Sequence, residues 1–331
     1  MKKFIPLCVP YFDGKEKEFL NDCIESTFVS TAGKYIELFE ESLKSKTKVA
    51  NVVTVNSGTS ALHLSLLAAG VKPNDLVITS DYSFIATANS IAYCDAEPVL
   101  IDVDYDSFNI DFDLVEKFLY EECTFKDNNY FHNATRKRVS ACVPVLALGN
   151  MICPSKLKKF KNKFNIPLIL DAAAAIGVKA DSLDFGDFDY DFATFSFNGN
   201  KIITCGAGGA VLCKNFKTFE KVKHLAATAR MQPSYFHDEV GYNYRMTNIS
   251  AAVGLAQLEK LDKLLKKKRD IYNFYKTSLQ SENIVFYNEP NNLFSSNWIS
   301  GFMLENSSEK EIFEFNKHMA KKGIGASSSV S

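Results

Sequence analysis

The chain has 331 residues, of which 46% are hydrophobic and 23% are charged, so it is long and apolar enough to bury a core and to form a second domain. Its 38 Lys and Arg residues almost balance 39 Asp and Glu residues, which argues against a nucleic-acid or anionic-lipid partner. The eight cysteines form no CxxC pair and have no histidine at ligand spacing. Neither a zinc site nor a disulfide scaffold is therefore predicted.

The N-terminus has none of the features of a targeting segment. Its first residues, MKKFIPLCVPYFDGKEKEF, lack the apolar stretch of a signal peptide. The longest uncharged stretches, 56–71 and 139–155, are interrupted by Gly, Pro, Ser or Asn and fall short of the roughly 20 apolar residues of a membrane helix. We therefore expect a cytoplasmic protein that has no membrane partner.

Helical and β-rich segments alternate along most of the chain. A helix start after residue 14, a break at 30–34 and a second amphipathic helix precede a strand at 51–55 and an apolar helix at 61–69. Further β-rich runs, separated by helical runs at 84–92, 113–122 and 156–164, lie at 76–79, 98–103, 140–146, 167–170 and 192–197. This alternation predicts an α/β fold with a mainly parallel central sheet that is covered on both faces.

Two segments depart from the alternation. Residues 123–138 are polar and aperiodic, which predicts an insertion or a surface hairpin. From residue 248 the pattern changes to one long amphipathic helix that ends in a basic run at 266–269, followed by weaker helical and strand signals. We expect a large domain at 1–247 and a smaller C-terminal domain at 248–331.

Open α/β sheets bind ligands beyond the carboxyl ends of their strands, and polar residues follow several of the predicted strands. Gly58 and Thr59 come after the strand 51–55 and open a helix, where free N–H groups form a site for an anion such as phosphate. Small residues also cap helices without binding anything. Phe84 follows the strand 76–79 and could either stack on a planar ring or pack in the core.

Asp171 and Lys201 carry charge in apolar surroundings. Asp171 closes the strand 167–170 before four alanines, so its carboxylate needs a cationic partner such as a protonated ring nitrogen, or caps a helix at 172–175. Lys201 lies between an aromatic strand and the Gly-rich stretch 206–209. A desolvated lysine there would have the lowered pKa that attack on an aldehyde requires, the alternative being a surface lysine.

These features match one cofactor when they are taken together. A phosphate cup, a carboxylate for a ring nitrogen, an aromatic for the ring face and a lysine for the aldehyde are the groups that bind pyridoxal 5′-phosphate (PLP). The sequence therefore predicts a PLP enzyme with no metal site.

The chain resembles the DegT/DnrJ/StrS family of PLP-dependent nucleotide-sugar aminotransferases from about residue 6 to residue 297. The motifs that carry this resemblance are NSGTSALHLSLLAAG, SFIATANSI, LDAAAAIG, TFSFNGNKIITCGAGGAV and HDEVGYNYRMTNISAAVGLAQLE. The insertion ending TRKRVSACVPV and the form FNGNKIIT resemble the branch that aminates 4-keto-6-deoxy-N-acetylhexosamines toward legionaminic-type sugars.

The resemblance implies a fold type I aminotransferase in which Lys201 binds the cofactor and acts as the general base. Asp171 would keep the ring nitrogen protonated, and Phe84 would stack on the ring. Gly58, Thr59 and Ser196 would hold the phosphate. Asn243 would reach a phosphate across a subunit boundary, which implies a homodimer with shared active sites.

The resemblance also implies a reaction. Glutamate would be the amino donor, leaving as 2-oxoglutarate, and the acceptor would be C4 of a UDP- or GDP-linked 4-keto-6-deoxy N-acetylhexosamine used in surface-polysaccharide biosynthesis. A perosamine-type 4-aminotransferase is the alternative within the family, because such enzymes share much of the GYNYRMTN region.

Two departures from the family pattern favour a further alternative, a catalytically impaired member. Ala174 stands where relatives have a polar residue near the cofactor's O3′, and alanine has no side-chain hydrogen-bonding group. The ending ASSSVS at 326–331 resembles no sequence of the family, so the small domain is expected to be truncated.

Overall fold

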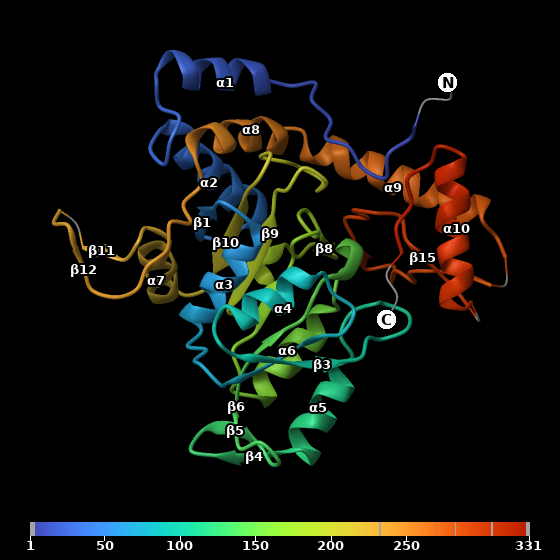
Figure 1. Cartoon of the computed structure of the whole chain (residues 1–331), viewed down its shortest axis with the longest axis horizontal. Helices are drawn as coiled ribbons and strands as arrows, with labels where there is room; N and C mark the ends of the chain where they lie inside the picture. Colours follow the sequence, from blue (N-terminus) through green and yellow to red (C-terminus); the bar gives the residue numbers. More distant parts are fainter. Residues whose placement is uncertain (1–3, 232, 282, 306, 329–331) are drawn as a thin grey trace.

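The structure of the protein is a computed structural model that describes residues 4–231, 233–281, 283–305 and 307–328 (Figure 1). The helices are α1 (Glu16–Glu25), α2 (Lys34–Thr47), α3 (Gly58–Ala68), α4 (Ile85–Ala92), α5 (Phe112–Glu121), α6 (Pro154–Lys163), α7 (Phe216–Ala226), α8 (Asn248–Leu258), α9 (Leu261–Ser278) and α10 (Glu309–Lys321), with 3-10 turns η1 (Ala147–Gly149) and η2 (Phe185–Asp187).

Strands occur throughout the described chain. They are β1 (Asn51–Val55), β2 (Leu76–Ser80), β3 (Glu97–Ile101), β4 (Cys123–Lys126), β5 (Asn129–His132), β6 (Arg138–Val143), β7 (Ile169–Asp171), β8 (Lys179–Ala180), β9 (Phe192–Ser196), β10 (Gly209–Cys213), β11 (Arg230–Met231), β12 (Phe236–His237), β13 (Ile284–Phe286), β14 (Leu293–Phe294) and β15 (Phe302–Leu304).

Seven strands build the central sheet in the order β3-β2-β6-β7-β9-β10-β1. The strands β3, β2 and β6 pair in parallel, as do β7 and β9. Parallel bridges from Cys142 to Leu168 and from Val145 to Asp171 join the two halves. Within this sheet β10 runs opposite to the other six strands, and it pairs antiparallel with β9 and β1. The predicted α/β fold with a mainly parallel sheet is confirmed.

Both faces of the sheet are covered, because side chains alternate in direction along each strand. Val52 and Leu212 belong to one core with the buried faces of α2, α5, α6, α8 and α9. Val53 and Val211 belong to the other core with those of α3, α4 and α7. The carboxyl ends of the parallel strands therefore meet at one edge, between two helical layers.

The polar segment 123–138 forms a hairpin. Its strands β4 and β5 pair antiparallel from Cys123 and His132 to Lys126 and Asn129, and β5 then pairs with the start of β6. Of the two alternatives for this segment, the structure shows the surface hairpin, which extends the sheet beside the start of β6 (Figure 1).

The single long helix expected from residue 248 is wrong. Two helices replace it, because α8 ends at Leu258 and α9 begins at Leu261. At the junction the ammonium of Lys260 binds Asp13 at 2.8 Å and Glu16 at 2.6 Å, which ties the break between the two helices to the N-terminal segment. The helix α8 packs against α1 and α2, so the division expected between residues 247 and 248 stays a prediction.

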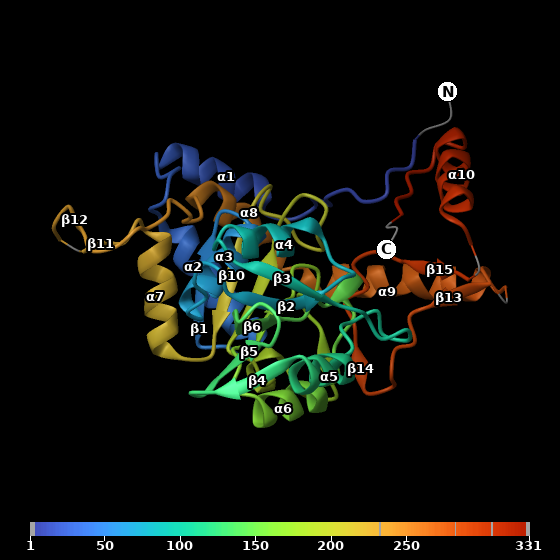
Figure 2. The ribbon, with the colours of Figure 1, turned by 60° about the horizontal axis from the view of Figure 1, so that its bottom comes forward.

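The residues after α9, here called the C-terminal part, lie at one end of the sheet beside α9 (Figure 2). It contains the antiparallel pair β13 and β15, with α10 beside it, and β14 pairs with β8 of the preceding region. The N-terminal segment runs across to the same part, where Ile5 forms a parallel bridge with Ile324. Among the described helices, none combines the length and the apolar character needed to cross a bilayer.

Candidate active site

A cradle for an anion lies where β1 leads into α3. Ser57 caps this helix, since its hydroxyl accepts the N–H of Ser60 at 3.0 Å, and the N–H groups of Gly58 and Thr59 in the first turn have no partner inside the helix. A Cβ atom on Gly58 would lie 2.7 Å from Cβ of Ser196 at the end of β9. The structure therefore brings Gly58, Thr59 and Ser196 together, and a larger residue at 58 would fill the cradle.

Asp171 ends β7 with its side chain almost fully buried, at 5% exposure. Its carboxylate accepts the hydroxyl of Thr87 at 2.7 Å and the N–H of Ala173 at 3.1 Å. Burial raises the pKa of Asp171, while these two hydrogen bonds and the charge of Lys201 act in the opposite direction. The helix-cap alternative is wrong, because residues 172–175 form a turn instead of a helix.

Thr87 is a site residue that the sequence analysis missed. It lies in the first turn of α4, fully buried, and gives Asp171 its hydroxyl hydrogen bond. The available signal was helical spacing, since Phe84 is the residue before α4 and Thr87 follows it by three positions. Phe84 itself is 76% exposed, so the core-packing alternative for this aromatic is wrong.

Lys201 belongs to the connection between β9 and β10, where its N–H donates to the carbonyl of Asn198 at 3.0 Å. Burial lowers the pKa of Lys201 to about 8, and the negative charge of Asp171 limits the fall. The Lys201 side chain is half-buried, with its Nζ atom over the ring of Trp298, which does not fit a fully solvated surface lysine. The carboxylate and the amine follow neighbouring parallel strands, because β7 ends at Asp171 and pairs with β9, which leads to Lys201.

Asn243 lies beside the anion cradle of its own chain. Its carbonyl accepts the side-chain amide of Asn56 at 3.3 Å, and the carbonyl of Tyr244 accepts the N–H of Asn56 at 2.8 Å. The segment thus runs along the edge of β1, where Val55 and Arg245 form an antiparallel bridge. The Asn243 side chain is exposed there, and its expected role across a subunit boundary stays a prediction.

Residue 174 has an apolar side chain, as the sequence indicates. Ala174 is buried, and its carbonyl accepts the hydroxyl of Ser296 at 2.7 Å. Ser296 comes from the C-terminal part and also meets Gly149, where a Cβ atom would lie 2.0 Å from the Ser296 hydroxyl. The turn after Asp171 is therefore held by the C-terminal part through its main chain.

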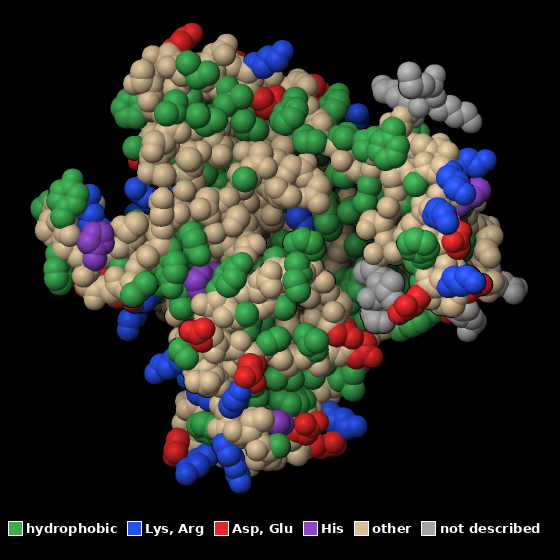
Figure 3. All heavy atoms as spheres, viewed as in Figure 1, with side chains coloured by type: hydrophobic (Ala, Val, Ile, Leu, Met, Phe, Trp, Pro, Cys, Tyr) green, Lys and Arg blue, Asp and Glu red, His purple; other side chains and the backbone are tan. Residues whose placement is uncertain are grey.

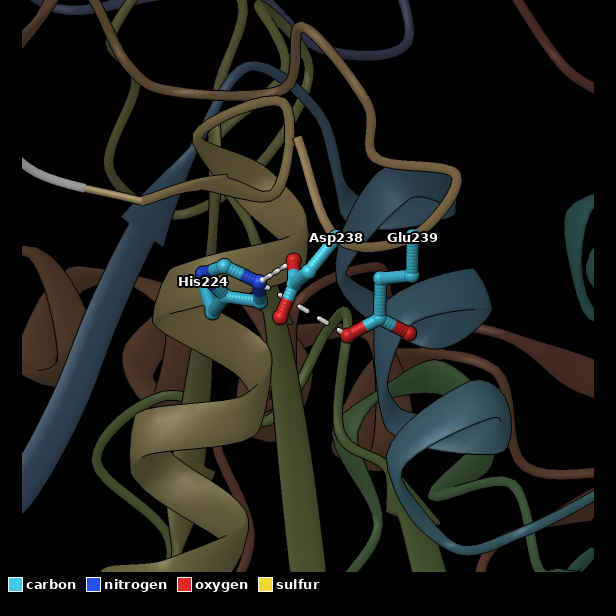
Figure 4. A group of neighbouring side chains, drawn as sticks. All are labelled: His224, Asp238 and Glu239. Carbon is cyan, nitrogen blue, oxygen red and sulfur yellow. Dashed lines mark hydrogen bonds and ion pairs between the residues drawn. The ribbon is translucent and has the colours of Figure 1, made fainter. Parts of the chain in front are cut away.

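His224, Asp238 and Glu239 form a further cluster of titratable side chains (Figure 4). His224 Nε2 is 2.7 Å from Asp238 and 3.7 Å from Glu239, and Lys221 of the same helix also pairs with Glu239. The lysine ammonium occupies the position that a cation would need to neutralise Glu239. We interpret the cluster as an ion-pair network that fixes residues 238 and 239 to α7.

Comparisons with known proteins bear on this geometry. Residues 10–329 match the model of the DegT/DnrJ/EryC1/StrS aminotransferase family. The chain belongs to this family. It is similar to a GDP-perosamine synthase of Escherichia coli O157:H7, with 34% identity over 323 residues that span 97% of this chain and 83% of the relative.

Two further similarities extend the comparison. A UDP-4-amino-4,6-dideoxy-N-acetyl-beta-L-altrosamine transaminase of Campylobacter jejuni is 34% identical over 250 residues, which cover 75% of this chain and 62% of the relative. The solved structure of Helicobacter pylori PseC, an aminotransferase of pseudoaminic acid biosynthesis, superposes with a TM-score of 0.84 at 24% identity, covering 97% of this chain and 83% of PseC. This last similarity shows the fold.

The prediction of a fold type I aminotransferase that uses PLP is confirmed. The residues present fit this cofactor. The first turn of α3 and Ser196 meet at Gly58, where no side chain fills the space, and a buried carboxylate and a lysine of lowered pKa follow neighbouring strands. The family is therefore established independently of the roles of individual residues, which remain predictions.

We predict that Thr87→Val weakens binding of PLP to the cofactor-free protein about tenfold, the effect of one hydrogen bond to a charged group. Without the hydroxyl, the pKa of Asp171 rises further and its negative charge is less available to a protonated ring nitrogen. An absorbance titration with PLP measures the affinity. Thr87→Ser keeps the hydroxyl and should bind as the wild type does; equal affinity in all three proteins would contradict the assigned contact.

We predict that covalent attachment of PLP to Lys201 becomes faster as the pH rises and levels off above about 8. Only the neutral amine attacks an aldehyde, and the lowered pKa makes that form abundant near pH 8. The rate is measured by absorbance after PLP is mixed with cofactor-free protein. Asp171→Asn removes a negative charge and should move the plateau to lower pH, whereas a rate still rising toward the ordinary lysine value of 10.5 would refute the assignment.

Proposed function

We propose that the protein transfers an amino group from glutamate to C4 of a nucleotide-linked 4-keto-6-deoxy sugar. The observation that carries this proposal is the position of Lys201 and of the buried carboxylate of Asp171 beyond the carboxyl ends of the neighbouring parallel strands β9 and β7. Such a pair suits a reaction in which one lysine alternately accepts and releases a proton near neutral pH.

The side chains divide the work as follows. Gly58, Thr59 and Ser196 hold the phosphate at the positive end of α3, and Phe84 covers one face of the ring. Asp171 keeps the ring nitrogen protonated, and Thr87 holds the carboxylate in orientation through its hydroxyl. When bound, PLP supplies an electron sink for the carbon from which Lys201 removes a proton.

Two kinds of support bear on the nucleotide and the sugar of the acceptor: the names of the relatives and the sequence motifs. The names of the relatives from Escherichia coli and Campylobacter jejuni support a GDP-linked and a UDP-linked sugar respectively, and the second is a 4-amino-4,6-dideoxy N-acetylhexosamine. The motifs FNGNKIIT and TRKRVSACVPV support the legionaminic-type branch. We propose an acceptor with a keto group at C4 and a deoxy C6, with the perosamine-type and legionaminic-type sugars as the two candidates.

We predict that the purified protein, incubated with glutamate and PLP, converts at least one GDP- or UDP-linked 4-keto-6-deoxy sugar into its 4-amino product. Mass spectrometry of the nucleotide sugar and assay of 2-oxoglutarate follow the two halves of the reaction. Lys201→Ala is the matched control and should form neither product. Normal attachment of PLP without turnover on any of these acceptors would contradict the proposal and favour an impaired member with Ala174 as its cause.

The proposed active unit is a homodimer. The hairpin of β11 and β12 projects from the body (Figures 1 and 2) and carries the strongly exposed rings of Tyr235 and Phe236. On the face seen in Figure 3, charged side chains gather around the edge and are sparse over the middle, where α3 and α4 lie. A projecting arm with exposed aromatic rings and a face of low charge suit burial against a second copy of the chain.

We predict that mixing inactive Lys201→Ala and inactive Asn243→Ala subunits restores activity. If Asn243 serves the partner's site, each mixed dimer contains one complete site, and random reassortment of equal amounts restores about a quarter of the wild-type rate. Dissociation in mild denaturant and dilution allow the subunits to exchange. Absence of recovery, with mixed dimers demonstrated by mass spectrometry, would place Asn243 in its own chain's site.

A further inference from the structure

The carbonyl of Asn200, the residue before Lys201, accepts two hydrogen bonds from distant parts of the chain. The indole N–H of Trp298 donates to it at 2.6 Å, and the thiol of Cys8 donates at 3.0 Å. Trp298 comes from the C-terminal part and Cys8 from the N-terminal segment. The main chain that carries the lysine is thus held from both sides.

The ring of Trp298 also meets the lysine side chain itself. The Nζ atom of Lys201 lies 3.6 Å from the centroid of this ring. The Trp298 main chain is fixed in turn, because its N–H donates to the carbonyl of Leu148 at 3.1 Å. One side chain therefore determines both where the lysine's main chain lies and where its amine rests.

We propose that Trp298 is a positioning residue for Lys201, which holds the lysine's main chain through its N–H and gives the charged amine a resting place on its ring. The inference rests on the proposed role of Lys201 as the cofactor-binding lysine. The structure places Trp298 against both the main chain before Lys201 and the amine itself.

The indole ring of Trp298 acts on the protonation of Lys201 in the opposite direction to burial. Burial disfavours the charged form of an amine, whereas the face of an indole ring attracts that form alone. The other groups that act on Lys201 are Asp171, which ends β7, and Cys8, whose sulfur is also 3.8 Å from the ammonium of Lys268 in α9. The ring thus supports the protonated state that the amine must adopt after it accepts a proton.

Two substitutions separate the two contacts. Trp298→Phe keeps a ring face and removes the N–H, and Trp298→Leu removes both. In cofactor-free protein, the pH dependence of Lys201 acylation by an amine-selective reagent, followed by mass spectrometry of the peptide, reports the pKa of the amine directly. The Lys201→Ala protein identifies the peptide signal.

We expect the pKa of Lys201 to fall by about one pH unit in Trp298→Leu and to stay near the wild-type value in Trp298→Phe. Hydrogen exchange at residues 198–203 should be faster than in the wild type in both variants, because each lacks the bond to Asn200. An unchanged or raised pKa of Lys201 in Trp298→Leu would contradict the proposed contact between the ammonium and the indole ring. Unchanged hydrogen exchange in Trp298→Phe would contradict the proposed role of the indole N–H in holding the main chain.

The design keeps this inference separate from the proposed function. Trp298→Phe is a conservative change, so it tests the hydrogen bond even if Trp298→Leu fails to fold, as an unfolding curve would show. If borohydride reduction fails to fix PLP on Lys201 in the wild type, the proposed function fails. The acylation profiles are measured without PLP and still decide whether Trp298 positions the amine.

Discussion

The burial of two opposite charges at one edge of the sheet is the constraint on which the site depends. A carboxylate and an ammonium removed from water each lose several kcal/mol of hydration, and only close partners can return this loss. Asp171 has a hydroxyl and an N–H as partners, while Lys201 has the charge of Asp171 and an indole ring. Neither set of partners fully offsets the hydration free energy that is lost on burial. Both groups can therefore still gain from contact with a cofactor of complementary charge.

The sheet explains why these groups meet. Asp171 and Ser196 end the neighbouring parallel strands β7 and β9, which pair from Ile169 and Phe192 onward. The helix α3 begins beside Ser196, because Gly58 has no side chain to keep the two segments apart. Three segments far apart in the sequence thereby bring the carboxylate, the hydroxyl and the N–H groups to one edge of the sheet. This arrangement follows from strand order more than from any local motif.

Much of this could be predicted from the sequence, and the failures have physical reasons. Strand and helix positions followed from apolar periodicity, and Asp171 and Lys201 were found because a charge in an apolar run needs a partner. The prediction of one long helix from residue 248 failed because the break at Lys260 involves Asp13 and Glu16, which lie more than 240 positions away in the sequence. Thr87 and Trp298 were missed since a threonine in a helix and a tryptophan near a strand are ordinary until tertiary contacts show what they face.

The antiparallel strand β10 has a mechanical consequence. Because the chain returns beside β9 without a helical crossover, the loop that carries Lys201 is tied at both ends to hydrogen-bonded strands, through Ser196 and Gly209. The lysine therefore shares the rigidity of the central sheet. The indole ring of Trp298 belongs to the C-terminal part. Any hinge motion between that part and the sheet would therefore change the distance between the Lys201 amine and the ring.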